Sequence, residues 1–351
     1  MKYKKLGKTD IDVSLICLGT MMWGDQVDEG PAHQQIEYAL DRGVNFVDTA
    51  ELYTIPAKAE TQGNTERIIG NWIEKNPGRR KDFLLASKVV GTWADRGMNW
   101  IRGGRHLLNK KNIHEALDLS LKRLKTDYLD LYQIHWPDRT TNNFGVRGYA
   151  HKPAEDNVLI EETLSVLNDL VKEGKIRHIG ISNETPWGMM QFLNLAKEKG
   201  YERIVSVQNP YNLLNRLYEV GCAEISIREE CGLLAYSPLG YGVLSGKYLQ
   251  NQVPKGSRFD VFPTYGPRFS GTPQAIEATE KYVEIAKRYG FSPVQLALAF
   301  VNSRDFTTSN IIGATNLNQL KENIDTVNIT LSDECLQDIE TVQESIPNPC
   351  P

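Results

Sequence analysis

The sequence has few of the features that mark disulfide-stabilised or metal-binding proteins. Only five of its 351 residues are cysteines, an odd number scattered along the chain without a Cys-x-x-Cys pair. This usage favours reduced thiols in a cytosol over a disulfide framework or a zinc site. His-x-x-x-His spacing and carboxylate clusters are also missing. We therefore expect a cytoplasmic protein without a bound metal.

Charge and hydropathy argue against two further classes of partner. With 40 basic and 44 acidic residues the net charge is −4, so no basic surface indicates binding to nucleic acid or to an anionic membrane. No apolar run is long enough to cross a bilayer, and the first residues lack the apolar core of a secretory signal. The expected partner is a small molecule, while the sequence leaves the oligomeric state open.

Short apolar runs alternate with amphipathic helical patterns along the chain. Strands are predicted at 14–20, 45–50, 83–90, 128–136, 176–182, 204–209, 233–237 and 310–314. Helices are predicted at 34–42, 65–74, 112–124 with Asn112 as N-cap, 161–174, 186–199, 219–231, 274–289, 293–302, 317–325 and 333–344. Eight such units favour an α/β fold of the closed (β/α)8 TIM-barrel type. We expect one domain over 1–351, with long active-face loops at 91–111, 137–156 and 241–272 and helices at the C-terminus.

Polar side chains stand near the carboxyl ends of three predicted strands. They are Asp48, Lys88 and His135. In a parallel β/α barrel these strand ends open on one face, so the three side chains would meet there. Each has a plainer explanation when taken alone, because a strand-end lysine can reach solvent and a strand-end histidine is often structural. Tyr53, a few residues beyond its strand, is one of fifteen tyrosines, most of which simply pack.

Two loop segments suggest contacts with phosphate groups. The glycine-rich stretch from Gly240 to Lys247 fits neither the dinucleotide fingerprint nor the Walker A pattern. Its backbone amides could still surround a pyrophosphate together with the lysine. The turn at Gly313 and Thr315 precedes a predicted helix, whose N-terminus favours an anion. On spacing alone, a flexible glycine loop and an ordinary β-to-α turn remain open as alternatives.

Taken together, these segments resemble the aldo-keto reductase family. The matching motifs are GVNFVDTAELY at 43–53, ASK at 86–88, DYLDLYQIHW at 127–136 and GKIRHIGISN at 174–183. Their order and spacing both agree, and the resemblance runs from about Tyr3 to Glu344. It is closest to the Tas-like branch, through 60–66, 180–185 and 209–215, and more distant to the potassium-channel β subunits.

The resemblance implies an NADPH-dependent reduction of aldehyde or ketone carbonyls to alcohols. Asp48, Tyr53, Lys88 and His135 would form the catalytic tetrad. Tyr53 would be the general acid, because the oxygen of the carbonyl needs a proton as hydride reaches its carbon. Lys88 would lower the pKa of this phenol, Asp48 would keep Lys88 charged, and His135 would orient the carbonyl. The alternative is a nucleotide-binding redox sensor with slow turnover, like the channel β subunits.

The resemblance also implies where NADPH would lie. The residues expected around it, from the nicotinamide to the adenosine phosphate, are Ser182, Asn183, Gln208, Tyr236, Ser237, Leu239, Gly242, Lys247, Arg258, Gly313, Thr315, Gln319, Glu322 and Asn323. Many family members carry basic residues where this chain has Gly313, Ala314 and Gln319, so the preference for NADPH over NADH is expected to be moderate. Trp23, Trp93 and Trp136 would line the pocket of the carbonyl substrate, with plain packing as the alternative.

Overall fold

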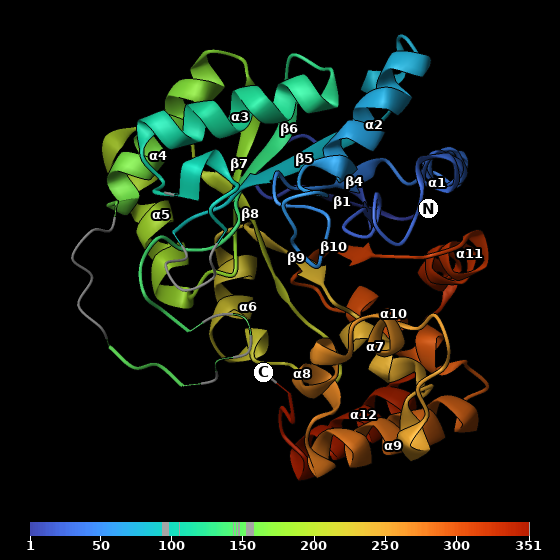
Figure 1. Ribbon diagram of the computed structural model, residues 1–351. Coiled ribbons are helices and arrows are strands. Elements are labelled where there is room, and N and C mark those ends of the chain that lie inside the picture. Colours follow the sequence, from blue (N-terminus) through green and yellow to red (C-terminus); the bar gives the residue numbers. More distant parts are fainter. Residues whose placement is uncertain are drawn as a thin grey trace.

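The computed structural model describes residues 1–92, 98–104, 106–142, 144, 146, 148–151 and 158–350. A closed barrel of parallel strands occupies its centre (Figure 1). The strands are β3 (Ile16–Gly19), β4 (Phe46–Asp48), β5 (Leu84–Val89), β6 (Leu129–Ile134), β7 (Ile176–Ser182), β8 (Ile204–Pro210), β9 (Gly232–Tyr236) and β10 (Thr307–Ile312). Each pairs with the next along the chain, and β10 closes the ring against β3. The predicted (β/α)8 barrel is confirmed.

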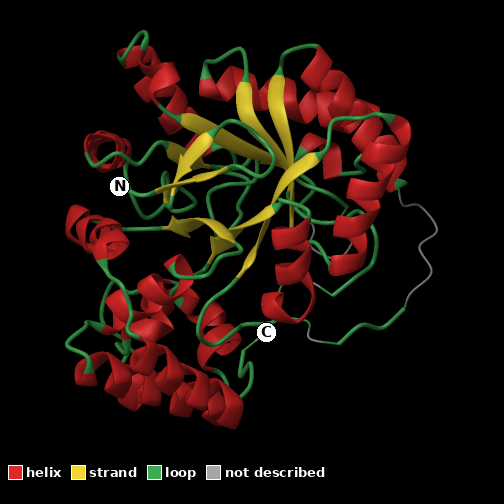
Figure 2. Cartoon of the chain, turned by 180° about the vertical axis from the view of Figure 1, so that it is seen from behind, coloured by secondary structure: helices red, strands yellow, loops and turns green. Residues whose placement is uncertain are grey.

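Helices surround these strands (Figure 2). They are α1 (Glu29–Asp41), α2 (Asn64–Lys75), α3 (Lys110–Leu124), α4 (Ile160–Lys172), α5 (Pro186–Lys199), α6 (Tyr218–Arg228), α7 (Arg258–Val261), α8 (Gly266–Ser270), α9 (Pro273–Arg288), α10 (Pro293–Asn302), α11 (Leu317–Asp325) and α12 (Asp333–Ser345). In Figure 1, α7 to α10 and α12 gather below the barrel, in orange and red. None of the described helices combines the length and apolar character needed to cross a bilayer.

Several predicted element boundaries were wrong, and three of them have a clear local reason or a large error. The last strand begins at Thr307 rather than at residue 310, because hydroxyl residues continue the strand before its apolar part; one of them, Ser309, donates through Oγ to the carbonyl of Ser14 at 2.7 Å. The N-cap of α3 is Asn109, whose side chain accepts from the backbone of Asn112 at 3.0 Å. The first barrel helix begins at Glu29, five residues earlier than predicted.

An N-terminal hairpin closes one end of the barrel. It consists of β1 (Tyr3–Lys5) and β2 (Asp12–Ser14). Leu6 and Val13 of this hairpin belong to one apolar cluster with inward-facing barrel residues such as Phe46 and Leu234. The approach at Gly7 is so close that a Cβ there would lie 2.2 Å from the carbonyl oxygen of Val205. The opposite end, where the parallel strands finish, is therefore the face that remains for a site.

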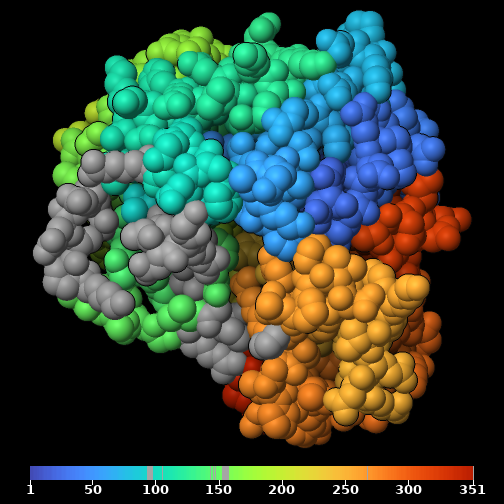
Figure 3. All heavy atoms as spheres, in the orientation of Figure 1, coloured from blue at the N-terminus to red at the C-terminus, as the bar shows by residue number. Residues whose placement is uncertain are grey.

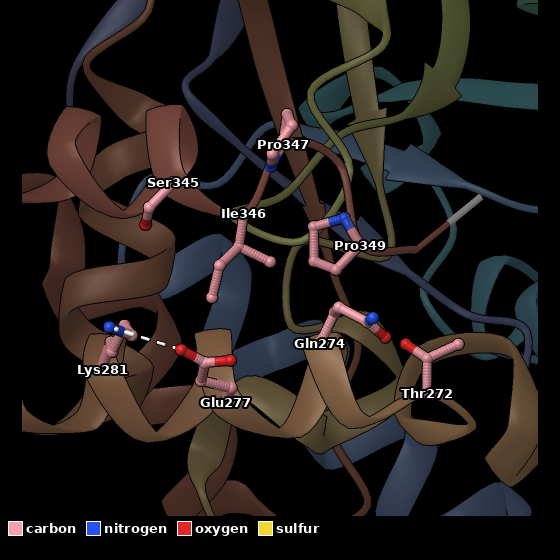
Figure 4. A pocket seen from close by; sticks show the side chains of 8 residues that line it. All are labelled: Thr272, Gln274, Glu277, Lys281, Ser345, Ile346, Pro347 and Pro349. Atoms are coloured by element: carbon pink, nitrogen blue, oxygen red, sulfur yellow. Dashed lines mark ion pairs between the residues drawn. The ribbon is translucent and has the colours of Figure 1, made fainter.

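A surface groove runs between α9 and the C-terminal segment (Figure 4). Its volume is about 520 Å³, and it is lined by Thr272, Gln274, Glu277, Lys281, Ser345, Ile346, Pro347 and Pro349. The Lys281 ammonium lies 3.5 Å from the Glu277 carboxylate within it. None of these residues belongs to the strand ends, so the groove is separate from the barrel mouth.

Candidate active site

Lys88 lies at the centre of the polar cluster where the strands end. Its ammonium donates to Asp48 Oδ2 at 2.6 Å, to the carbonyl of Thr49 at 2.7 Å and to the hydroxyl of Tyr53 at 3.2 Å. The Lys88 side chain is fully buried, and the Tyr53 ring lies 4.7 Å from the nitrogen. A buried charge is costly unless it is paired and hydrogen-bonded, and here both conditions hold. The register that pairs β4 with β5 thus brings three predicted residues together.

Two side-chain amides hold the other oxygen of the Asp48 carboxylate. Gln208 donates to Asp48 Oδ1 at 2.8 Å and Gln133 donates to the same atom at 3.2 Å. The two amides also contact each other, since Gln208 Nε2 lies 3.3 Å from Gln133 Oε1. With Lys88 on the second oxygen, the carboxylate is fixed from three strands.

Burial and charge act in opposite directions on the two groups that face each other here. Burial by itself lowers the pKa of the Lys88 ammonium, but Asp48 and Tyr53 outweigh burial and hold that pKa above its usual range. Burial raises the pKa of the Tyr53 phenol, and the nearby Lys88 charge opposes this rise without cancelling it. At neutral pH the phenol is therefore protonated. We expected Lys88 to lower the pKa of Tyr53. Its charge does act in that direction, but burial has the larger effect and the pKa is raised.

The imidazole of His135 faces Tyr53 edge-on, with the ring centres 5.7 Å apart. Burial, assisted by the charge of Lys88, lowers the pKa of His135 well below its usual range. The ring is therefore neutral and has one N–H to donate. Its Nδ1 has no hydrogen-bond partner within the described part of the chain. Trp136 packs against the imidazole, at 4.8 Å between ring centres.

A hydrogen-bonded chain links this cluster to the ends of β7, β8 and β9. Asn183 Nδ2 donates to the carbonyl of His135 at 2.9 Å, and Asn183 Oδ1 accepts from the Tyr236 hydroxyl at 2.6 Å. Ser182 Oγ donates to the carbonyl of Gln208 at 2.7 Å. The four residues predicted around a nicotinamide carboxamide and ring thus lie beside the tetrad.

The loop after β9 carries the residues predicted for the pyrophosphate. Ser237, Tyr241 and Gly242 all have positive φ angles, so the backbone turns sharply from Ser237 past Leu239 to Gly242. A Cβ at Gly242 would lie 3.1 Å from the Lys247 ammonium nitrogen, which shows how closely this lysine folds over the loop. Lys247 forms no ion pair with the described carboxylates; its nitrogen lies 5.2 Å from the Tyr248 ring centre. An unpaired cation above a tight glycine turn fits an anionic group such as a pyrophosphate.

The residues predicted at the adenosine end follow the neighbouring strand, β10. Gln319 Oε1 accepts from both the backbone N–H and the hydroxyl of Thr315, at 2.9 and 3.0 Å. Asn323 donates to the carbonyl of Gly313 at 3.3 Å. These four residues therefore form one connected turn at the start of α11. The Glu322 carboxylate instead accepts from the hydroxyl of Ser292 at 2.7 Å, at the N-cap of α10.

The three predicted pocket tryptophans have different positions. Trp93 lies outside the described residues. Trp23 is wholly enclosed in the main apolar core, and its indole points to Gln35 Oε1 at 3.3 Å. It offers no aromatic surface to a ligand, so it has a packing role, contrary to the prediction. Trp136 is also buried, but it packs on His135 and donates to the carbonyl of Thr92 at 3.2 Å.

Two functional-site residues escaped the sequence analysis. Gln133 lies on β6 two residues before His135, which directly follows this strand, so period-two alternation directs both toward the same side. This signal was available. Arg268, on α8, donates to the Tyr241 hydroxyl at 2.8 Å and so borders the site. Nothing in the local sequence distinguishes it from a solvent-exposed arginine.

Buried carboxylates fasten the loops around the site. Glu51 Oε1 accepts from the backbone of Val90 at 2.8 Å, and Glu51 Oε2 forms a buried ion pair with Arg102 of the first long loop. Asp138 accepts from the backbone of Thr92 at 2.9 Å and of Leu108 at 3.1 Å.

On the face shown in Figure 3, the blue N-terminal segment borders the orange one. At this border the Lys58 ammonium lies 5.9 Å from the ring centre of Phe262.

Comparison with known proteins gives one consistent result. Residues 15–344 match the model of the Aldo/keto reductase family. The chain is 46% identical to Protein tas of Escherichia coli, over the full length of both. It is 32% identical to Aldo-keto reductase YhdN of Bacillus subtilis, covering 98% of this chain and 94% of that one. A probable voltage-gated potassium channel subunit beta of Oryza sativa is 30% identical, with 99% and 98% covered.

Proposed function

This chain belongs to the aldo-keto reductase family of oxidoreductases, and we propose that it reduces aldehyde or ketone carbonyls to alcohols with NADPH. The observation that carries the proposal is the contact of the Lys88 ammonium with both Asp48 and Tyr53, at 2.6 and 3.2 Å. A protonated phenol held by a buried cation is suited to give a proton to a developing alkoxide. We treat residues 1–351 as one catalytic domain.

Tyr53, Lys88 and His135 would each act on the carbonyl oxygen or on the proton that it receives. When bound, the dihydronicotinamide supplies the hydride. Tyr53 donates its proton to the oxygen as negative charge grows there, and Lys88 stabilises the phenolate that remains. The neutral imidazole of His135 donates a hydrogen bond to the same oxygen and orients the carbonyl. Trp136, packed on that imidazole, keeps the ring in place and helps to exclude water.

The residues that would hold the cofactor divide into three groups along the mouth. Ser182, Asn183, Gln208 and Tyr236 stand beside the tetrad and would position the nicotinamide. The loop from Ser237 to Lys247 would bind the pyrophosphate, with Arg258 nearby. The turn formed by Gly313, Thr315, Gln319 and Asn323 would contact the adenosine phosphate, where only neutral groups and a helix N-terminus are available.

A steady-state assay with NADPH and a panel of aromatic aldehydes and quinones tests the proposal. We expect turnover by the wild type and its loss in Tyr53→Phe, by roughly 10²–10⁴-fold, because general acid catalysis contributes that much. NADP⁺ affinity should stay near wild type in this variant, since the phenol contacts the substrate. Tyr3→Phe, which alters a tyrosine bonded to the carbonyl of Gly43 far from the tetrad, is the matched control.

The same assay distinguishes the proposed reductase from the alternative, a nucleotide-binding sensor. Tight NADPH binding with negligible turnover on every substrate of the panel would favour the sensor. Turnover that survives unchanged in Tyr53→Phe would mean that another group is the acid.

A further inference from the structure

Arg268 is a half-buried cation that is bonded to tyrosine side chains rather than to a carboxylate. Its Nη1 donates to the Tyr241 hydroxyl at 2.8 Å, and the guanidinium carbon lies 5.5 Å from the centre of that ring. Its Nε and Nη2 are buried and have no hydrogen-bond partner among the described residues. Buried donors without a partner are expensive, so such an arrangement indicates a site that a ligand anion completes.

Five other buried or half-buried arginines of the described chain are held by carboxylates. They form the ion pairs Arg80–Asp130, Arg102–Glu51, Arg123–Glu66, Arg139–Glu184 and Arg216–Glu219. Arg268 has the phenols of Tyr236 and Tyr241 as its neighbours instead. Arg258 shares the Tyr241 ring, at 5.2 Å, and its remaining neighbours are Tyr248 and Tyr265. The mouth thus concentrates positive charge that no described carboxylate neutralises.

Arg268 lies nearer to the proposed catalytic residues than to the turn predicted for the adenosine phosphate, and this position indicates which molecule would carry the anion. It lies beside the Tyr236 phenol, which donates to Asn183, and Asn183 in turn donates to the carbonyl of His135. Tyr241 is close enough to Tyr53 to influence its pKa. Lys247 already folds over the loop predicted for the pyrophosphate. An anion on Arg268 would therefore belong to the molecule that meets Tyr53 and His135.

We propose that Arg268 binds a carboxylate of the carbonyl substrate, so that the enzyme prefers aldehydes or ketones that carry a carboxylate away from the reacting group. This inference rests on the reductase function proposed above. A guanidinium presents paired N–H groups that match the two oxygens of a carboxylate, and Nε and Nη2 are the pair left unused. Tyr241, through its bond to Nη1, fixes the orientation of that pair.

The test compares 4-formylbenzoate with its methyl ester, which has nearly the same shape and no charge. We expect the wild type to show a higher kcat/KM for the acid. In Arg268→Met the value for the acid should fall by roughly ten- to one-hundred-fold, as expected for a lost charge-assisted hydrogen bond, while the ester changes less than about two-fold. Arg268→Lys should retain part of the preference. Arg288→Met removes an exposed charge paired with Asp338 and is the control for net charge.

Two further measurements, together with the wild-type comparison, decide between explanations. NADP⁺ affinity should be unchanged in Arg268→Met; if it weakens while acid and ester lose activity equally, the anion is the cofactor pyrophosphate and the inference is wrong. The melting temperature should not fall, because the variant removes two buried donors that have no partner. A fall with equal loss on both substrates indicates a structural role and overturns the inference. If the wild type reduces the acid and the ester equally well, the carboxylate preference is refuted, but the proposed reductase function stands. If the wild type reduces neither substrate, both proposals are refuted.

Discussion

At the scale of single residues, Lys88 decides the chemistry of the site. One buried ammonium serves three oxygens, from Asp48, Thr49 and Tyr53. Removing its charge would leave the Asp48 carboxylate buried with only the amides of Gln133 and Gln208 as partners. The same ammonium opposes the rise that burial imposes on the pKa of Tyr53. Under the proposed function, Lys88 would therefore act on structure and on proton transfer through one set of contacts.

Lys88→Met should move the basic limb of the reduction profile to higher pH. Reduction needs the protonated phenol, so kcat/KM falls as pH rises through the pKa of Tyr53. Because Lys88 lowers this pKa, its removal raises it, and the limb should shift to higher pH. The measurement is kcat/KM against pH with NADPH saturating, and the absolute rate should also fall.

Lys88→Arg provides the matched comparison, since it retains a cation at this position. Its basic limb should stay nearer that of the wild type even if its rate is low. A limb that does not move in Lys88→Met would show that the lysine positions Tyr53 without controlling its proton.

The grouping of Asp48, Lys88 and His135 could be predicted because each stands near a strand end in a recognisable motif, and Tyr53 follows its strand within the same motif as Asp48. The barrel face on which they meet follows from strand direction alone. Arg268 could not be predicted in this way, because its burial and its contact with Tyr241 depend on how α8 packs over the mouth. Trp23 was wrong for the converse reason: an aromatic residue near a loop was assigned to a pocket, and the fold encloses it between core residues.

At the scale of elements, α2 and α3 approach each other closely at Gly70. A Cβ added there would lie 2.1 Å from the carbonyl oxygen of Arg123, a backbone atom that cannot move without shifting the end of α3. The side chain of Arg123 in turn donates to the buried Glu66 of α2 at 2.6 Å, and Glu66 accepts from Ser87 of β5. The glycine thus allows an ion pair that connects two helices to the barrel.

Gly70→Ala should destabilise the protein despite the better helix propensity of alanine. Overpacking costs about 1–3 kcal/mol, and separation of Arg123 from Glu66 would add to that cost. The free energy of unfolding from urea titration measures the effect. Gly30→Ala is the control, because Gly30 also lies in a helix but has no atom within 4 Å of its added Cβ. That change should be neutral or stabilising by up to about 1 kcal/mol. Equal effects at both positions would contradict the packing argument.

Element type could be predicted from periodicity for most of the barrel, whereas element boundaries could not. The strand at β10 is made of Thr307, Thr308 and Ser309 before its apolar residues, so hydrophobicity alone placed its start too late. Asn109 and Asn112 are both good N-cap residues, and only the structure shows that the earlier one accepts the capping bond. These choices depend on tertiary contacts that a local pattern does not contain.

At the scale of the whole molecule, the barrel is closed at one end and organised around its mouth at the other. The hairpin residues Leu6 and Val13 pack against the inward-facing core, so ligands are left with the face where the strands finish. Residues from β4 through β10, far apart in the chain, contribute to that face. A dinucleotide lying across it would contact loops after β7, β9 and β10 at once, and its binding would therefore stabilise the barrel as a unit.

Nucleotide binding should accordingly raise the melting temperature, and NADP⁺ should do so more than NAD⁺. At one hundred times its dissociation constant a ligand adds about 2.7 kcal/mol. With about 2.1 cal/mol/K of unfolding entropy per residue, a chain of 351 residues should gain roughly 4 °C. The side-chain carbonyl oxygen of Gln319 accepts two hydrogen bonds from Thr315, so the turn offers only neutral donors to the 2′-phosphate of NADP⁺. The affinity for NADP⁺ should therefore exceed that for NAD⁺ by about ten-fold, or about 1.4 kcal/mol. NAD⁺ at the same concentration should therefore raise the melting temperature about 2 °C less. Equal shifts in differential scanning fluorimetry would mean that the turn at Thr315 and Gln319 does not face the phosphate.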